Sequence, residues 1–121
     1  MAKHKILVID DDQDILDAIR FTLEDEGYLV ETSKNAGMID DMSENNIPSL
    51  IILDVLLEGD DGRQISRKLK GNPVTKNIPV ILVSADTAAK KYFSYSKASD
   101  FLSKPFDIDE LLSKIKNLLK K

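Results

Sequence analysis

The sequence predicts a doubly wound α/β protein, in which helices cover both faces of a parallel β-sheet. Short apolar runs alternate along the chain with segments of helical periodicity, and each run is nearly continuous. Continuous runs are typical of parallel strands that are buried on both faces. Five strand–helix pairs fit into 121 residues, the usual length of one domain. We therefore expect a single domain over residues 1–121, with right-handed crossovers between its strands.

Five segments are expected to form the strands of this sheet. KILVI is apolar after its first residue, and SLIILD is apolar between its two ends. IPVILVSA has the same character, whereas YLVET and DFLS are more polar or shorter. The expected strands are residues 5–9, 28–32, 49–54, 78–85 and 100–103.

Five helices are expected to follow these strands. Asp12 or Asp14 can cap the first helix, and Gly27 can end it. The last helix has the clearest pattern, because Asp107 and Glu110 resemble a capping box and precede apolar residues at helical spacing from Ile108 to Leu119. The other three are a weak helix around Met38, Ile39 and Met42, a helix near residues 61–70, and a helix at residues 87–97 with a ragged apolar face.

The composition excludes several classes of protein. The chain has no cysteine, which excludes disulfides and cysteine-based metal sites, and its net charge of −4 argues against a nucleic-acid-binding surface. It has no apolar stretch of the roughly 18 residues that a membrane span needs, no secretory signal pattern and no glycine-rich nucleotide-binding motif. We therefore expect a cytoplasmic protein that binds neither nucleic acid nor a membrane directly.

Polar residues stand where the expected strands end. Asp10 and Asp11 follow the first strand, and Asp54 ends the third. Ser84 lies at the end of the fourth strand, and Lys104 follows the fifth. The carboxyl ends of parallel strands meet at one edge of a sheet, where ligands bind in this class of fold. If the first and third strands are neighbours, the acids lie together at that edge.

This set of side chains predicts a Mg²⁺ site that supports phosphoryl transfer. Clustered carboxylates repel one another, and a hard cation with oxygen ligands offsets the repulsion. Asp54 would then be ionised and able to attack phosphorus, while Lys104 and Ser84 would contact the transferred group. Each residue alone also fits a turn, a helix cap or a solvent-exposed lysine. The prediction therefore depends on the whole set.

Over essentially its whole length, the chain resembles the receiver domain of bacterial two-component response regulators. The motifs that carry the resemblance are ILVIDDD, LIILDVLLEGDDG, ILVSA and DFLSKPFD. The resemblance implies a flavodoxin-like fold, with a five-stranded parallel sheet in the order 2-1-3-4-5 and five helices.

The same resemblance implies a role for each residue at the edge of the sheet. The implied Mg²⁺ ligands are Asp10, Asp11, Asp54 and the backbone carbonyl of Leu56. Asp54 would be the phosphoacceptor, with Lys104 and Ser84 as its catalytic partners. Ser84 and Phe101 would be the switch residues, and the peptide bond before Pro105 is expected to favour the cis form.

The implied function is that of a signalling switch, not of an enzyme that acts on a separate substrate. A histidine kinase or histidine phosphotransfer protein would phosphorylate Asp54, and the chain would catalyse only its own phosphorylation and dephosphorylation. Phosphorylation would change the face formed by the fourth helix, fifth strand and fifth helix. That change would alter the affinity for an output protein or domain that the sequence does not identify.

The sequence departs from the family pattern in the loop after Asp54 and in the region before the fifth strand. Glu58 stands where the family usually has proline, so the conformation of that loop is open. The stretch from Ser84 to Lys104 is shorter than usual and lacks a glycine before the fifth strand, so we expect a short, shifted or irregular fourth helix. At least one of its aromatic residues Tyr92, Phe93 and Tyr95 is expected in the core, and the others, beside Lys90, Lys91 and Lys97, form a candidate partner surface.

Two other functions compete with the phosphorylated switch. A degenerate receiver would bind partners without phosphorylation, but the acid, hydroxyl and lysine set is complete in this chain. A phosphohydrolase of the haloacid dehalogenase type would use the D-x-D formed by Asp10 and Asp12, but the chain has no room for a cap domain. Phosphodonor labelling separates the first alternative from the switch, and turnover of small phosphate esters would indicate the second.

Overall fold

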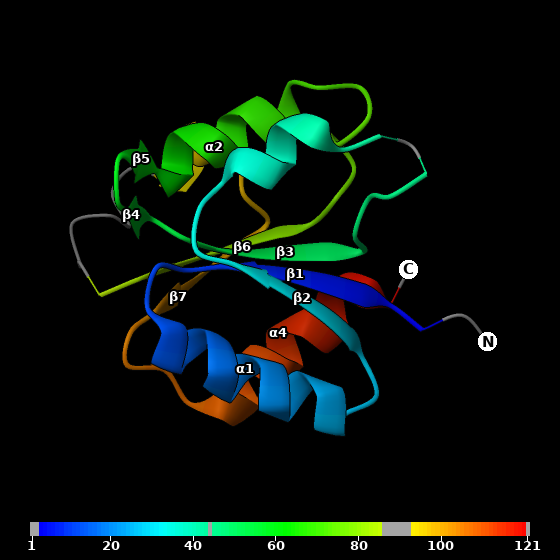
Figure 1. Ribbon diagram of the computed structural model, residues 1–121, viewed down its shortest axis with the longest axis vertical. Helices are drawn as coiled ribbons and strands as arrows, with labels where there is room; N and C mark the ends of the chain where they lie inside the picture. The colour runs from blue at the N-terminus through cyan, green and yellow to red at the C-terminus, as the bar shows by residue number, and fades with distance from the viewer. Residues whose placement is uncertain (1–2, 44, 86–92, 121) are drawn as a thin grey trace.

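The computed structural model describes residues 3–43, 45–85 and 93–120, and it arranges them as a central sheet between two layers of helices (Figure 1). α1 and α4 lie on one side of the sheet, and α2 lies on the other. The elements are β1 (Lys5–Ile9), α1 (Gln13–Asp25), β2 (Leu29–Ser33), the 3₁₀ helix η1 (Gly37–Asp41), β3 (Leu50–Asp54), β4 (Leu56–Leu57), β5 (Asp60–Asp61), α2 (Gly62–Lys70), β6 (Val80–Ser84), α3 (Phe93–Ser96), β7 (Asp100–Ser103) and α4 (Ile108–Leu119).

The main sheet has the order β2-β1-β3-β6-β7, and every neighbouring pair of strands in it is parallel. Since β6 and β7 are the fourth and fifth expected strands, the predicted order 2-1-3-4-5 is confirmed. The strand bounds differ from the expected ones by one or two residues at several ends. The fourth strand begins at Val80 and not at Ile78, because Pro79 has no N–H to donate to a strand ladder.

Both faces of the sheet are buried, as the continuous apolar runs predict. Alternate residues of each central strand enter two separate clusters, so that Ile6 and Val8 pack towards α1 and α4, while Leu7 and Ile9 pack towards α2 and η1. β1, β3 and β6 contribute to both clusters. This double burial fixes the sheet between its helices and thus fixes the positions of the strand ends.

The helices differ from the prediction at two places. The described ranges contain four α-helices and one 3₁₀ helix, not five α-helices. The weak second helix is η1, which is too short for an α-helical apolar face and buries only Ile39. Of the expected helix at residues 87–97, only α3 is described, because residues 86–92 lie outside the described ranges with Lys90, Lys91 and Tyr92.

The helix ends follow the predicted chemistry. Asp12 caps α1 by accepting a hydrogen bond from the backbone N–H of Asp14, and α1 ends just before Gly27. Asp107 caps α4, but its side chain accepts from Asp109 N and not from the N–H of Glu110. No helix in the described part of the chain is long and apolar enough to cross a membrane.

The main correction is a short antiparallel hairpin formed by β4 and β5, directly after β3. The sequence does not predict it, since each strand has only two residues. Its turn contains Glu58 and Gly59, and Gly59 has a φ of +80°, a conformation that favours glycine. The hairpin shows how the loop after Asp54 is built without the usual proline.

Candidate functional site

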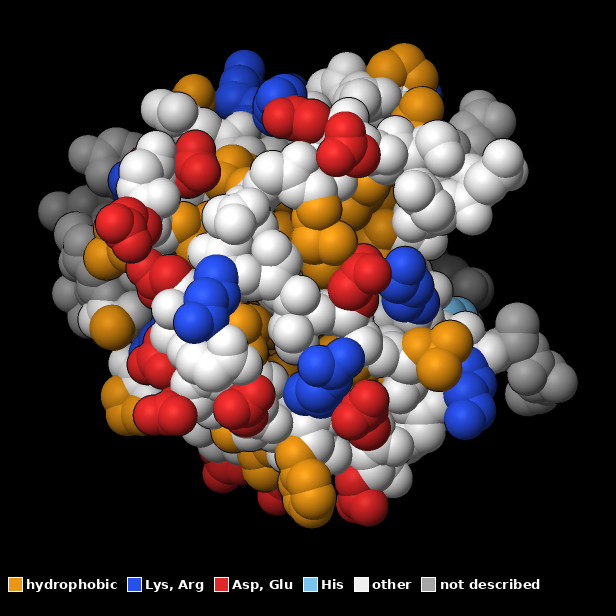
Figure 2. Space-filling model, viewed as in Figure 1, with side chains coloured by type: hydrophobic (Ala, Val, Ile, Leu, Met, Phe, Trp, Pro, Cys, Tyr) orange, Lys and Arg blue, Asp and Glu red, His pale blue; other side chains and the backbone are white. Residues whose placement is uncertain are grey.

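The expected site residues leave four neighbouring strands at the same edge of the sheet. The register pairs Ile9 of β1 with Leu53 of β3, so the next residues, Asp10 and Asp54, stand side by side. The β4–β5 hairpin lies at this edge (Figure 1). Acidic side chains are spread over the face shown in Figure 2, and several of them lie towards this edge.

Three carboxylates converge there. One side-chain oxygen from each of Asp10, Asp11 and Asp54 lies within 4.8 Å of the others. Asp10 and Asp54 are only 3% and 6% exposed, respectively, whereas Asp11 is exposed. The structure therefore brings the three predicted acids together and opens their cluster to solvent on the side of Asp11.

Lys104 reaches this cluster from the end of β7. Its ammonium lies 2.8 Å from Asp10 Oδ2 and 3.4 Å from Asp54 Oδ2. The other oxygen of each acid accepts a backbone N–H, since Asp12 N donates to Asp10 Oδ1 at 2.9 Å and Leu56 N to Asp54 Oδ1 at 3.3 Å. Each buried carboxylate is thus oriented by a backbone donor on one oxygen and by the ammonium on the other.

The electrostatics of the site are unbalanced towards negative charge. Burial, followed by the charge of Asp10, raises the pKa of Asp54, although Lys104 and the N–H of Leu56 act in the opposite direction. Burial alone would lower the pKa of Lys104, but its hydrogen bond to Asp10 and the charges of Asp54 and Asp10 raise it overall. The ammonium of Lys104 therefore does not fully offset the combined effect of burial and the charge of Asp10 on Asp54.

The donor set fits a hard divalent cation. Mg²⁺ takes oxygen ligands from one or two carboxylates and retains waters or phosphate oxygens in its other positions. The cluster offers carboxylate oxygens only, two of them from buried acids, and leaves a solvent-facing side for the remaining ligands. A cation here would also offset the repulsion from Asp10, which adds to burial in raising the pKa of Asp54.

Ser84 lies beside this site at the end of β6, and Phe101 lies near the start of β7. Ser84 ends β6, is 1% exposed, and follows Val83, which pairs with Asp54. Its carbonyl accepts the N–H of Lys104 at 2.8 Å, and the Lys104–Pro105 bond is cis, as expected. Phe101 is half-buried, and its ring meets that of Phe93 edge-on, with centroids 6.3 Å apart.

Of the aromatic residues expected before β7, Phe93 and Tyr95 are described, and they divide between core and surface. Phe93 packs against the α2 side of the core, and Tyr95 is 48% exposed. Tyr95 contacts Arg67 of α2, whose guanidinium carbon lies 4.7 Å from the centroid of the tyrosine ring. Arg67 was not among the residues singled out in the sequence, because 28 positions separate it from Tyr95.

The sequence alone does not single out two further residues near the site, Gly62 and Asp61. Gly62 begins α2 so close to β3 that an added Cβ would lie 2.3 Å from Asp54 O and 2.8 Å from Val55 Cα. Asp61 caps α2 and accepts hydrogen bonds from the backbone and guanidinium of Arg63. The sequence shows only that a glycine, Gly62, follows the acidic loop. Why a glycine is needed there becomes clear only from its close approach to β3.

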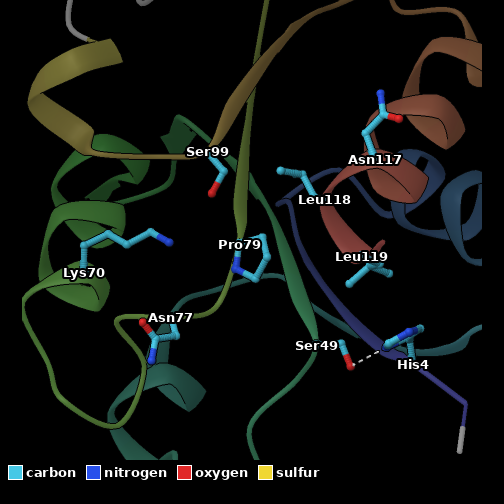
Figure 3. A pocket seen from close by; sticks show the side chains of 9 residues that line it. All are labelled: His4, Ser49, Lys70, Asn77, Pro79, Ser99, Asn117, Leu118 and Leu119. Atoms are coloured by element: carbon cyan, nitrogen blue, oxygen red, sulfur yellow. Dashed lines mark hydrogen bonds between the residues drawn. The ribbon is translucent and has the colours of Figure 1, made fainter. Parts of the chain in front are cut away.

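A pocket of about 480 Å³ lies at the opposite edge of the sheet, between Lys70 of α2 and Leu118 and Leu119 of α4 (Figure 3). The Lys70 ammonium already donates to the Ile78 carbonyl. Because α2 and α4 both end at this pocket, the negative ends of their dipoles weaken any attraction for an anion. The carboxylates and the lysine that the sequence predicts for phosphoryl transfer lie at the other edge of the sheet.

Comparisons with known proteins identify the family of this chain. The family model described as the response regulator receiver domain matches residues 6–116. The chain is 36% identical over 116 residues to the response regulator PleD of Caulobacter vibrioides, covering 94% of this chain and 26% of that protein. It is 29% identical over 119 residues to the phosphate regulon transcriptional regulatory protein PhoB of Rhizobium meliloti, covering 97% of this chain and 52% of that protein. The chain thus spans about a quarter to a half of these relatives.

Solved structures agree in fold over nearly the whole chain. A putative response regulator from Chloroflexus aurantiacus superposes with a TM-score of 0.91 at 30% identity, covering 99% of this chain and 100% of that one. The response regulator TrrA from Thermotoga maritima, solved in complex with Mg²⁺ and BeF, has a TM-score of 0.85 at 28% identity and covers 96% of this chain and 99% of that one.

Proposed function

The chain belongs to the response regulator receiver domain family, and from this premise we propose that it is a signalling switch in which Asp54 accepts a phosphoryl group. Receiver domains bind Mg²⁺ at an acidic site. In this chain the ligands would be Asp10, Asp11, Asp54 and the backbone carbonyl of Leu56.

The observation that carries the proposal is the convergence of three carboxylates and one ammonium at the ends of β1, β3 and β7. In the transfer, an oxygen of Asp54 forms a bond to phosphorus while the bond from phosphorus to the donor's histidine nitrogen breaks, and the departing imidazole takes up a proton. When bound, Mg²⁺ would offset charge on the transferred oxygens. Lys104 would exchange its contact with Asp54 for a contact with the new phosphoryl group.

We propose that Ser84 and Phe101 convert this transfer into a change of surface. The Ser84 hydroxyl would bond to a phosphoryl oxygen, and the half-buried ring of Phe101 would move inward into the space beside it. The face formed by α3, β7 and α4 would then change shape. A preference of a few kcal/mol for one arrangement is sufficient to shift the population between two states.

The partners follow from this chemistry. The phosphodonor would be a histidine kinase or a histidine phosphotransfer protein, acting in the cytoplasm, and the readout would be a protein or a further domain whose affinity for the α3–β7–α4 face changes. We propose no direct binding of nucleic acid and no turnover of a separate substrate. A receiver that acts without phosphorylation is not favoured, because it has no need for two buried acids beside an ammonium.

The proposal is tested by labelling with a small phosphodonor. With acetyl phosphate and Mg²⁺, the intact mass of the wild-type protein should rise by one phosphoryl group. Asp54→Asn should abolish the rise, whereas Asp60→Asn, which changes an exposed acid of β5, should keep it. Labelling of the Asp54→Asn variant at the wild-type level would refute the assignment of the acceptor.

A further inference from the structure

α3 is described over Phe93–Ser96, and several contacts hold this segment in place. Part of the support is local, since Ser96 is fully buried and its hydroxyl donates to Phe93 O and accepts from Ala98 N. Further contacts of this segment come from α2 and β7.

Arg67 of α2 contacts the outer side of α3 through the backbone carbonyl and the ring of Tyr95. Its Nη1 donates to the backbone carbonyl of Tyr95 at 3.1 Å, and its guanidinium lies over the tyrosine ring at 4.7 Å. A planar guanidinium can do both at once, which an ammonium cannot do equally well. The carbonyl contact fixes the backbone of α3, and the ring contact fixes its outward side chain.

The inner side of α3 touches the expected switch residue. Phe93 precedes Tyr95 by two positions, so that its side chain points to the other side of the helix. Its ring meets Phe101 edge-on at an interplanar angle of 81°. Phe101 pairs with Leu82 in the sheet, two residues before Ser103 pairs with Ser84. A displacement of Phe101 therefore has to be accommodated by Phe93, and hence by α3.

We propose that Arg67 is a positioning residue that holds α3, and through Phe93 also Phe101, in the arrangement described here. This inference rests on the proposed function, since it assumes that phosphorylation of Asp54 moves Phe101. The contacts of Arg67 belong to the unphosphorylated arrangement, and α3 strains or loses them when Phe101 moves inward. Arg67 thereby opposes the switch and sets how strongly the α3–β7–α4 face responds.

Linkage gives a direct test of this role. Beryllofluoride with Mg²⁺ is an analogue of the phosphoryl group on an aspartate, and its affinity depends on how easily the protein adopts the phosphorylated arrangement. Arg67→Met keeps the aliphatic stem but removes the guanidinium. It should bind beryllofluoride about threefold to tenfold more tightly than the wild-type protein, as expected for the loss of one hydrogen bond and one exposed cation–π contact. Backbone amide NMR signals report the affinity.

Arg20→Met is the matched control. Arg20 is also exposed and also donates from its guanidinium to a backbone carbonyl, that of Val30, at 3.1 Å, but it lies on α1 and does not touch α3. The affinity of Arg20→Met for beryllofluoride should stay within twofold of the wild-type affinity, which is a free-energy difference of at most about 0.4 kcal/mol. Tyr95→Phe keeps the ring and the carbonyl and should behave like the wild-type protein, whereas Tyr95→Ala removes the ring alone and should tighten binding by a smaller factor.

The outcomes separate this inference from its premise. Equal affinity of the wild-type and Arg67→Met proteins, or weaker binding by Arg67→Met, overturns the role of Arg67 and leaves the proposed function standing. Absence of binding to the wild-type protein overturns the proposed function and removes the inference with it. If Arg67→Met does not give a folded amide spectrum, Tyr95→Ala decides alone, and an unchanged affinity of that variant counts against the proposal.

Discussion

At the scale of single residues, Lys104 is the group on which the two buried acids depend. Asp10 and Asp54 are nearly inaccessible to water, and like charges in such a place are costly unless a cation accompanies them. The ammonium of Lys104 contacts both acids from a strand that is not adjacent to either. It therefore stabilises the site before any metal ion or phosphoryl group is bound.

Lys104→Ala should accordingly lower the metal-free free energy of unfolding by about 2 kcal/mol, because two buried carboxylates lose a charged hydrogen-bond donor. Mg²⁺ should still bind and should restore most of this loss, since the ion replaces the missing positive charge. Urea unfolding with Mg²⁺ and with a chelator measures both effects. Lys114→Ala, which breaks the more exposed ion pair between Lys114 and Asp100, serves as the control and should cost less than about 1 kcal/mol.

The same variant should separate phosphorylation from the response of the α3–β7–α4 face. Amide NMR signals of β7 should move on addition of Mg²⁺ and beryllofluoride in the wild-type protein and should move little in Lys104→Ala. If the amide signals of β7 move as much in Lys104→Ala as in the wild-type protein, Lys104 has no part in the switch.

At the scale of elements, the start of α2 and the end of β3 form one packed unit. Gly62 N donates to Val55 O at 2.7 Å, and the backbone of α2 approaches that of Asp54 too closely for any side chain at position 62. Val55 N in turn donates to Val83 O at 2.9 Å. The orientation of Asp54 therefore depends on a helix that begins several residues later in the chain.

Gly62→Ala should disturb this unit, because the new Cβ meets backbone atoms that cannot rotate away. We expect a loss of about 1–3 kcal/mol in the free energy of unfolding, as for other overpacked sites, together with slower phosphorylation by acetyl phosphate. Gly71→Ala is the matched control, since the nearest atoms to its Cβ are at 3.6 Å and 3.7 Å. Wild-type stability of Gly62→Ala would show that the close approach is not constraining.

The cap of α2 should make a pH-dependent contribution to the free energy of unfolding. Hydrogen bonds from Arg63 lower the pKa of Asp61 below its ordinary value, although burial acts against them. A carboxyl with a lowered pKa stabilises the folded state above its unfolded pKa, and this contribution is lost as the pH falls through its folded pKa. Asp61→Ala should cost about 1 kcal/mol at neutral pH.

The difference in the free energy of unfolding between Asp61→Ala and the wild-type protein should therefore become smaller at acidic pH. Chemical denaturation at neutral pH and at a pH below the lowered pKa of Asp61 measures it. A difference that is the same at both pH values would mean that the ionised carboxylate is not the source of the stabilisation.

Strong local patterns predict the elements well, and contacts between distant segments limit the prediction. Continuous apolar runs identify the five strands of the main sheet, and aspartates identify the starts of α1 and α4. η1 is not an α-helix because its apolar residues are too few, and the β4–β5 hairpin is too short to leave a pattern. The contact between Arg67 and Tyr95 exists only after α2 and α3 have packed together.

At the scale of the whole molecule, the parallel sheet explains why a site can be predicted from residues far apart in the sequence. All its strands point the same way, so every residue that follows a strand lies at one edge. Asp10, Asp54 and Lys104 meet for this reason, although 94 positions separate the first from the last. The exact contacts of Lys104 with the two acids do not follow from the sequence, since they depend on side-chain reach. We propose that residues 1–121 fold as one domain, because both core clusters share β1, β3 and β6.

We propose above all that a metal ion among these carboxylates makes Asp54 an acceptor of phosphorus. The most direct test is the intact mass of the metal-free wild-type protein after exposure to acetyl phosphate over a series of Mg²⁺ concentrations, followed by mapping of the labelled residue. We expect one added phosphoryl group, located on Asp54 and formed only when Mg²⁺ is present. Equal labelling in the presence of a chelator, or a label on any other residue, would contradict it.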